Sequence, residues 1–303
     1  MATPPSDHFV KALQFTKRVH RDVYPAIDPA NPELSLAGKV AIITGASRGI
    51  GANGLVPAFV KAGVKALVLV ARNEAKLASV AEQAKTLNPS VETLIYPLDI
   101  TDEPSVAALF DKVASVFGHA DILVNNAGSG DSYGPLADTE PKLWWDDFTV
   151  NIAGPYYFTY HFLKTLPADA RGTVVNVTTG AHLVIPTMSS YMLSKLAATQ
   201  LAAFVAAETA GAGRDVTAVA LYPGTIETDL TLDVLRPFAK DTHALAGGVA
   251  VWCCSDRARF LNGRWMDVNW DVEDLYDRRE EIAEKKLLQV GITGEFGPEQ
   301  FEA

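Results

Sequence analysis

Seven short apolar runs, separated by segments with helical patterning, dominate this sequence. The runs lie at 40–44, 66–70, 93–96, 122–125, 173–177, 216–221 and 264–268. Between most of them apolar residues recur at helical spacing, over 52–62, 74–87, 103–117, 142–166 and 189–210. Strands that alternate with helices in this way pair in parallel and take helices on both faces of one sheet. The pattern therefore predicts a single-domain α/β fold, with a doubly wound, mostly parallel seven-stranded sheet in a three-layer α/β/α arrangement.

Two flanking segments lie outside this alternation. Residues 1–37 form an amino-terminal extension in which Phe9, Leu13 and Val19 predict a short helix before a proline-rich stretch. We expect this extension to clasp the outside of the α/β domain, which spans residues 38–270. Residues 271–303 form a helical tail, interpreted either as a solvated helix packed by one face or as a subunit contact.

Charge and composition limit the classes of partner. The formal net charge is −10 and the pI is near 5.1, which disfavours nucleic acid and anionic membranes as partners. No apolar run reaches the roughly 18 residues of a membrane span, and the amino terminus is polar. We therefore expect a soluble, cytoplasmic protein. The two cysteines, Cys253 and Cys254, are adjacent, so they supply neither an ordinary disulfide nor the spaced ligands of a metal site.

A glycine-rich turn directly follows the first run. In Thr44-Gly45-Ala46-Ser47-Arg48-Gly49-Ile50-Gly51 the glycines permit a tight turn, and the helix that starts there favours a phosphate at its N-terminus. The spacing is G-x-x-x-G-x-G rather than the commoner G-x-G-x-x-G. Taken alone, the turn is weak evidence, because an ordinary strand-to-helix connection can have the same glycines.

A phenol and an ammonium lie one helical turn apart in Tyr191-Met192-Leu193-Ser194-Lys195. Reduction of a carbonyl needs a hydride on carbon and a proton on oxygen, so the site needs an acid. The pKa of a free tyrosine is about 10, and a nearby ammonium lowers it by stabilising the phenolate. The pair is therefore predicted to supply the acid of a hydride-transfer reaction.

Five elements together resemble the short-chain dehydrogenase/reductase family over residues 38–268. Beyond the glycine turn and the Tyr191–Lys195 pair, they are Asn125-Asn126-Ala127-Gly128, Asn151 and Pro223-Gly224, in the family order. The resemblance implies a Rossmann-type fold, a homodimer or homotetramer, a ribose contact from Lys195 and a water held by Asn151 for the proton relay. It also implies a set of cofactor-binding residues: Gly45, Ser47, Arg48, Gly49, Ile50, Gly51, Asp99, Ile100, Asn126, Ala127, Gly128, Tyr191, Lys195, Pro223, Gly224, Ile226 and Thr228.

The end of the second strand indicates which nicotinamide cofactor binds. NAD-selective proteins place an acid there to hold the ribose 2′-hydroxyl, whereas this chain has Ala71-Arg72. Arg72 and Arg48 can both face a 2′-phosphate, for which a guanidinium fork is well shaped. We therefore predict NADP(H).

The usual substrate-orienting serine of the family is replaced by threonine. Asn176-Val177-Thr178-Thr179 stands where Asn-x-Ser-Ser is usual. A threonine keeps the hydroxyl but adds a methyl group and a stiffer χ1. Motif alignment assigns the role to Thr179 and counting back from Tyr191 assigns it to Thr178. We prefer Thr179, because strand position fixes side-chain direction more firmly than loop length does.

The predicted substrate crevice lies beyond the carboxyl ends of the strands. Its expected walls are 129–133, 181–188 and 225–238, which are largely apolar, and the first two contain neither arginine nor lysine. A hydrophobic small-molecule substrate is therefore expected. His182 is interpreted either as a surface-loop histidine, which we favour, or as a side chain that contacts a polar substituent of the substrate. The alternatives are a non-redox enzyme (isomerase, cyclase, dehydratase or rearrangement catalyst) and a non-catalytic NADPH sensor. The two terminal segments resemble a subgroup frequent in fungal specialised metabolism.

Overall fold

A parallel seven-stranded sheet forms the centre of the molecule. The computed structural model describes residues 4–180, 183–294 and 296–298. The strand order is β3-β2-β1-β4-β5-β6-β7, and every pairing is parallel. The bounds are β1 Val40–Thr44, β2 Ala66–Ala71, β3 Glu92–Pro97, β4 Ile122–Asn125, β5 Gly172–Val177, β6 Val216–Tyr222 and β7 Arg264–Asp267. The predicted fold class is confirmed, including the number of strands.

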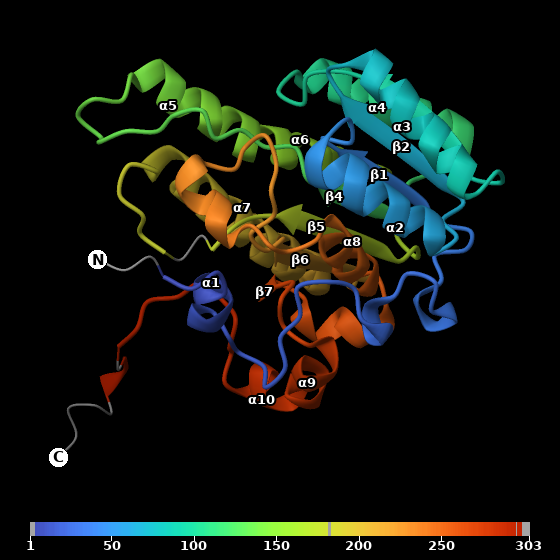
Figure 1. Ribbon diagram of the computed structural model, residues 1–303. Coiled ribbons are helices and arrows are strands. Elements are labelled where there is room, and N and C mark those ends of the chain that lie inside the picture. The colour runs from blue at the N-terminus through green and yellow to red at the C-terminus, as the bar shows by residue number, and fades with distance from the viewer. Residues whose placement is uncertain (1–3, 181–182, 295, 299–303) are drawn as a thin grey trace.

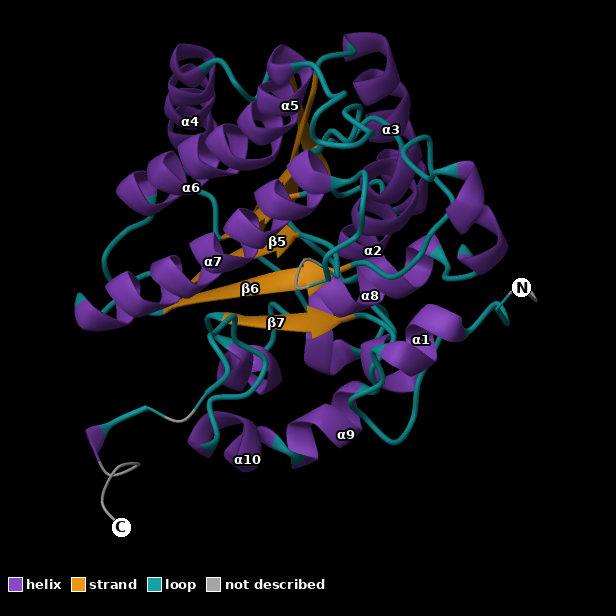
Figure 2. Cartoon of the chain, turned by 90° about the vertical axis from the view of Figure 1, so that its left-hand side faces the viewer, coloured by secondary structure: helices purple, strands orange, loops and turns teal. Residues whose placement is uncertain are grey.

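Helices cover both faces of the sheet (Figures 1 and 2). The helices α2 (Val56–Lys61), α3 (Glu74–Leu87) and α8 (His243–Trp252) pack on one face. On the other face lie α4 (Glu103–Phe117), α6 (Gly154–Thr165) and α7 (Ser189–Gly211). Shorter helical elements connect these: the π-helical turns Gly51–Leu55 and Thr149–Ala153, α5 Pro141–Phe148, and the 3-10 helices Pro25–Ile27, Pro32–Leu34, Asp233–Phe238 and Asp256–Leu261. Apart from the outer strand β3, the sheet is thus shielded from water, which is why its strands read as apolar runs.

Two helical segments differ from the sequence-based expectation. The helix expected over 142–166 is interrupted by the π-helical turn Thr149–Ala153, which separates α5 from α6. No helix was expected over His243–Trp252, where the structure has α8. The site depends on both segments, because the first carries Asn151 and the second packs behind the glycine turn.

The strand order reverses direction between β1 and β4. From β1 the chain moves outward to β2 and β3, and then returns to β4 on the other side. Loops that leave the carboxyl ends of β1 and β4 therefore run to opposite sides and open a crevice between them. The glycine turn follows β1 and Asn126 follows β4, so both lie at this crevice.

The two terminal segments pack against the edge of the sheet that carries β7. The amino-terminal part begins with α1 (His8–Ala12), and Val19 forms an isolated antiparallel bridge with Trp270. The carboxyl-terminal tail forms two short helices, α9 (Val272–Asp277) and α10 (Arg279–Glu284), rather than one. Figure 1 shows α1, α9 and α10 on this same side of the sheet. Among the described residues, no helix has the length and apolar character needed to cross a bilayer.

Candidate active site

One cavity of 680 Å³ gathers nearly all the predicted site residues. It runs along the carboxyl ends of the strands from Arg72, after β2, to Gly224, after β6. Of the predicted residues, its lining includes Gly45, Ser47, Arg48, Gly49, Ile50, Arg72, Asp99, Ile100, Asn126, Ala127, Gly128, Thr178, Thr179, Tyr191, Lys195, Pro223, Gly224, Ile226 and Thr228. Gly51 and Asn151 do not line it. Its volume lies in the range that is typical of sites for cofactors and small molecules.

The glycine turn is closely packed against the loop after β4. Gly45 has a φ of +66°, and a Cβ there would lie 2.9 Å from the Cα of Ala127. A Cβ on Gly51 would overlap the carbonyl oxygen of Gly45, so Gly51 lets the helix approach the turn rather than lining the cavity. The side chain of Asn126 donates to the carbonyl oxygen of Thr44 at 2.9 Å, which ties the turn to β4. The glycines thus let the turn pack closely, and its role in binding a pyrophosphate stays a prediction.

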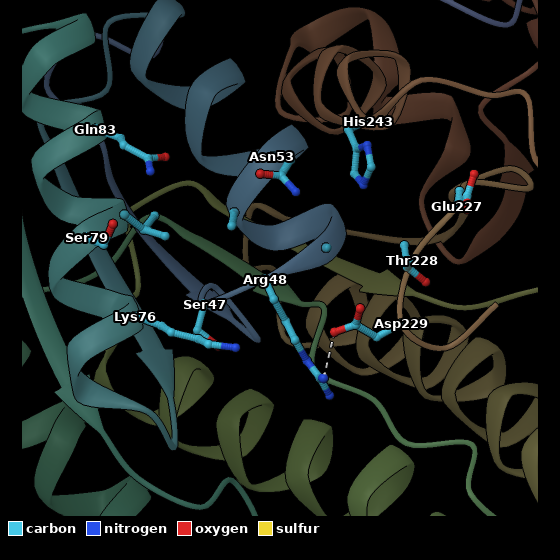
Figure 3. Close-up of a pocket in the computed structure, with 13 residues that line it drawn as sticks. Ser47, Arg48, Asn53, Lys76, Ser79, Gln83, Glu227, Thr228, Asp229 and His243 are labelled. Atoms are coloured by element: carbon cyan, nitrogen blue, oxygen red, sulfur yellow. Dashed lines mark hydrogen bonds and ion pairs between the residues drawn. The ribbon is translucent and has the colours of Figure 1, made fainter.

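Cationic side chains surround one end of the cavity. Arg72 and Lys76 are exposed there beside Asp99, and Arg48 pairs with Asp229 at 2.9 Å. Figure 3 shows Lys76 extending from α3 toward Ser47. The pKa of Asp99 is lowered, chiefly by the backbone N–H of Thr101. Sequence reasoning missed Lys76; its signal was a lysine one helical turn beyond Arg72, on the first turn of the next helix.

Tyr191 lies at the opposite end of the cavity, with the side chain of Thr179 against its phenol. Burial raises the pKa of Tyr191 to about 12, and Tyr133 and Asp147 add to the rise. Thr179 acts in the other direction and lowers this pKa. The sequence-based expectation of a lowered pKa is therefore wrong for this structure, because desolvation of the phenolate outweighs the favourable contacts.

Lys195 is buried beside Tyr191. Its Nζ lies 5.9 Å from the centre of the Tyr191 ring and donates to the carbonyl oxygen of Val177 at 3.0 Å. Burial lowers the pKa of Lys195 to about 8. A Cβ on Gly128 would lie 3.1 Å from Nζ, so the absence of a side chain at this position leaves room for the ammonium.

Asn151 lies in the π-helical turn and is almost fully buried. Its side-chain oxygen accepts from the N–H of Ser129 at 3.0 Å. Its amide donates to the carbonyl oxygen of Ser129 at 2.8 Å and to the hydroxyl of Ser194 at 3.0 Å. The carboxamide thus holds the loop after β4 against α7. The water-holding role implied by the family resemblance stays a prediction.

The two threonines after β5 have different surroundings. The hydroxyl of Thr178 is buried at the cavity without a hydrogen-bond partner among the described residues. Such a group offers a hydrogen bond to a bound molecule. Thr179 faces Tyr191 instead, and its carbonyl oxygen accepts from the indole N–H of Trp265 at 2.9 Å. The geometry brings both threonines to the cavity but only Thr179 to the phenol.

Many apolar side chains line the cavity next to Tyr191, together with polar ones such as Ser129 and Asp131. All three expected walls contribute, through Tyr133, through Leu183, Ile185 and Met188, and through Leu230, Leu232 and Leu235. Ala181 and His182 lie outside the described residues. Phe9 and Leu13 of the amino-terminal segment also line the cavity, which sequence reasoning missed. Their only signal was apolar spacing of four residues in a predicted helix.

The parallel sheet, the glycine turn at its switch point and the Tyr191–Lys195 pair define a dinucleotide-binding α/β oxidoreductase. The family model described as short chain dehydrogenase matches residues 39–236. The chain belongs to this family, and its fold is one that binds a nicotinamide cofactor. Among the described residues, no group of three or more His, Cys, Asp or Glu side chains is placed to hold a metal ion.

Fungal proteins and a solved bacterial structure are similar to this chain. The short chain dehydrogenase mpl6 of Monascus purpureus is 37% identical over 97% of this chain and 100% of its own length. The short chain dehydrogenase pigC of Monascus ruber is 36% identical over 91% and 92%. A gluconate 5-dehydrogenase from Burkholderia cenocepacia, solved in complex with NADP and tartrate, has a TM-score of 0.70 at 26% identity, covering 82% of this chain and 99% of that one. These fungal relatives confirm the resemblance to a subgroup that is frequent in fungal specialised metabolism.

Proposed function

We propose that this chain is an NADPH-dependent reductase of a carbonyl or imine in a hydrophobic small molecule, or the reverse dehydrogenase. The observation that carries the proposal is a single cavity with cationic side chains at one end and Tyr191 with Thr179 at the other. The apolar walls beside Tyr191 support a hydrophobic substrate. Fungal relatives support a place in fungal specialised metabolism.

The bound cofactor would supply the hydride, and residues of this chain would do the rest. Tyr191 donates its phenolic proton to the substrate oxygen or nitrogen as the hydride arrives. Burial keeps the phenol protonated before the reaction, so the proton is present when it is needed. Thr179 donates a hydrogen bond that orients the substrate, and the ammonium of Lys195 stabilises the phenolate that forms. Asn151 positions the loop that carries Ser129.

The preference for NADP(H) rests on the charge around the 2′-position of the cofactor. Arg72, Arg48 and Lys76 line one end of the cavity, and no acid ends β2. The bacterial relative was solved with NADP, which supports the assignment. We expect Arg72→Asp to raise the Michaelis constant for NADPH and to leave that for NADH unchanged or lower. The matched control is Lys85→Asp, the same charge change at an exposed position on α3 outside the cavity. An unchanged Michaelis constant for NADPH in Arg72→Asp would contradict the assignment.

The first experiment is a fluorescence titration with NADPH and NADH, followed by NADPH consumption with hydrophobic ketones, quinones and imines. Tight NADPH binding with turnover of any compound supports the reductase. Tight binding without turnover favours the non-redox alternative, in which Tyr191 acts as acid or base. Absence of binding contradicts the cofactor assignment itself.

We also propose a cytoplasmic homodimer or homotetramer. Large apolar side chains remain exposed on α6 and α7, including Tyr156, Tyr160, Leu193 and Phe204. Phe204 is 62% exposed, the highest value of these four side chains, and exposed apolar patches are typical of association surfaces. Light scattering of the parent and of Phe204→Glu tests this: we expect an oligomer that the charge weakens, and a monomeric parent would contradict the proposal.

A further inference from the structure

We propose that α1 is a specificity element of the active site, in which Phe9 and Leu13 form a wall of the substrate cavity and limit the size of the substrate. This inference rests on the proposed function, because it assumes that the cavity beside Tyr191 holds the substrate. Both side chains line the cavity that Tyr191 and Thr179 also line. Phe9 lies in α1 and Leu13 caps its C-terminus four residues later, so the two side chains lie on the same side of the helix.

The contacts of these two side chains place them on different parts of the cavity. The ring of Phe9 packs edge-to-face on Phe238, with 5.0 Å between ring centres. Phe238 ends the 3-10 helix Asp233–Phe238 in the loop after β6, which supplies another wall. Leu13 reaches the loop after β5, where its Cδ1 lies 3.9 Å from the position that a Cβ on Gly180 would take. The pair therefore bridges the two loops that flank the substrate space.

The helix α1 has only five residues and cannot be stable by itself. Hydrogen bonds hold it at both ends, one from the α/β domain and one from further along the amino-terminal segment. The indole N–H of Trp270 donates to the carbonyl oxygen of Leu13 at 2.8 Å, and the guanidinium of Arg21 donates to that of Ser6 at 3.1 Å. Figure 2 shows α1 on the side to which the arrowheads of β6 and β7 point. A wall fixed in this way can discriminate by size, whereas a loose arm would yield to a larger ligand.

The burial pattern of the side chains on α1 supports the same interpretation. Phe9 and Leu13 are half-buried, while Lys11 and Ala12 on the other side are exposed. The apolar face of the helix thus remains partly open toward the cavity rather than fully packed in the core. Lys11 pairs with Asp7 on the surface, at 2.7 Å, and so provides a matched control position on the same helix.

Two variants change the size of the proposed wall in opposite directions. The measured quantity is the kcat/KM for 2-acetylanthracene divided by the kcat/KM for acetophenone. We expect Leu13→Ala to raise this ratio about tenfold and Leu13→Trp to lower it about tenfold. A change of one methylene or more in an apolar pocket changes kcat/KM by at least that factor. Phe9→Ala tests the wall at a second position and should also raise the ratio. The ratio should be unchanged in Lys11→Ala. The dissociation constant for NADPH should be unchanged in all four variants, because α1 lies at the substrate end of the cavity.

A binding measurement separates this inference from the proposed function. The fluorescent ketone 6-propionyl-2-(dimethylamino)naphthalene reports entry into an apolar site by its emission shift, with or without turnover. We expect its dissociation constant to change about tenfold in Leu13→Ala and Leu13→Trp and to stay the same in Lys11→Ala. If this holds and no ketone is reduced, the wall stands and the reductase proposal fails. If ketones are reduced but the ratio and the dissociation constant stay within twofold in every variant, the wall is refuted. Failure of the probe to bind the parent protein refutes it as well.

Discussion

The ion pair between Arg21 and Asp241 offers a direct test of how the amino-terminal segment is held. The Asp241 side chain is fully buried, and Arg21 is 26% exposed, with 2.7 Å between Nε and Oδ1. Breaking a buried pair from one side costs roughly 3–5 kcal/mol. Asp241 retains two N–H donors, from Asn269 and from the backbone of Thr225. We therefore expect Arg21→Met to lower the free energy of unfolding by about 3 kcal/mol, at the lower end of that range.

Urea unfolding followed by tryptophan fluorescence measures this loss, and a double-mutant cycle isolates the pair. Arg21→Met and Asp241→Asn together should cost about 2 kcal/mol less than the sum of the single changes. The control is Lys285→Met, which breaks the exposed pair with Glu281 and should hardly move the midpoint. A loss below about 1 kcal/mol in Arg21→Met, or simple additivity in the cycle, would refute the view that this pair anchors the segment.

Three further predictions concern Tyr191, the threonines and a buried acid. Tyr191→Phe should lower kcat by about 10²–10⁴-fold with cofactor affinity retained; an active variant would remove Tyr191 from the chemistry. Thr179→Ala should lose far more turnover than Thr178→Ala, and the reverse order would assign the orienting hydroxyl to Thr178. Burial raises the pKa of Asp267 to about 8. At pH values between the ordinary pKa of an aspartate and about 8, the folded chain therefore holds one more proton than the unfolded chain. The free energy of unfolding consequently falls as the pH rises through this range. Thermal melts should therefore show Asp267→Asn gaining on the parent from pH 5 to 8; a constant difference would mean that Asp267 is already ionised at pH 5.

The sheet could be predicted because buried parallel strands carry their signal in the sequence itself. Each run expected up to β6 lies within an observed strand, and the last exceeds β7 by one residue. The helix α8 escaped prediction for the opposite reason. It is buried all round, so it has no polar face, and Gly247 and Gly248 within it read as breakers. The structure shows why glycine is needed: Gly247 faces the carbonyl of Gly54, and Gly248 faces that of Ile27.

For the site, too, the parts formed by local sequence motifs could be predicted, whereas the parts formed by contacts between distant segments could not. The glycine turn and the Tyr191–Lys195 pair are short segments whose geometry follows from one turn or one helix. Lys76 joins the cationic end because the fold places α3 beside the cavity. Leu13 contacts Gly180, although more than half of the chain length separates the two residues in the sequence. The pKa of Tyr191 shows the same limit: spacing predicted the ammonium beside it but could not give the burial that dominates its pKa.

Asp241 connects the amino-terminal segment to the loop after β6, which carries the predicted cofactor-binding residues Pro223 and Gly224. Its carboxylate accepts from Arg21 and also from the N–H of Thr225, the residue after Pro223-Gly224. Removing the whole segment would therefore release the loop after β6 together with α1. Such a deletion could not distinguish loss of the substrate wall formed by Phe9 and Leu13 from loss of the cofactor site. Point variants separate the two: Leu13→Ala should change only substrate parameters, whereas Arg21→Met should also weaken NADPH binding. If Arg21→Met leaves NADPH affinity unchanged, Asp241 holds the loop without help from the segment.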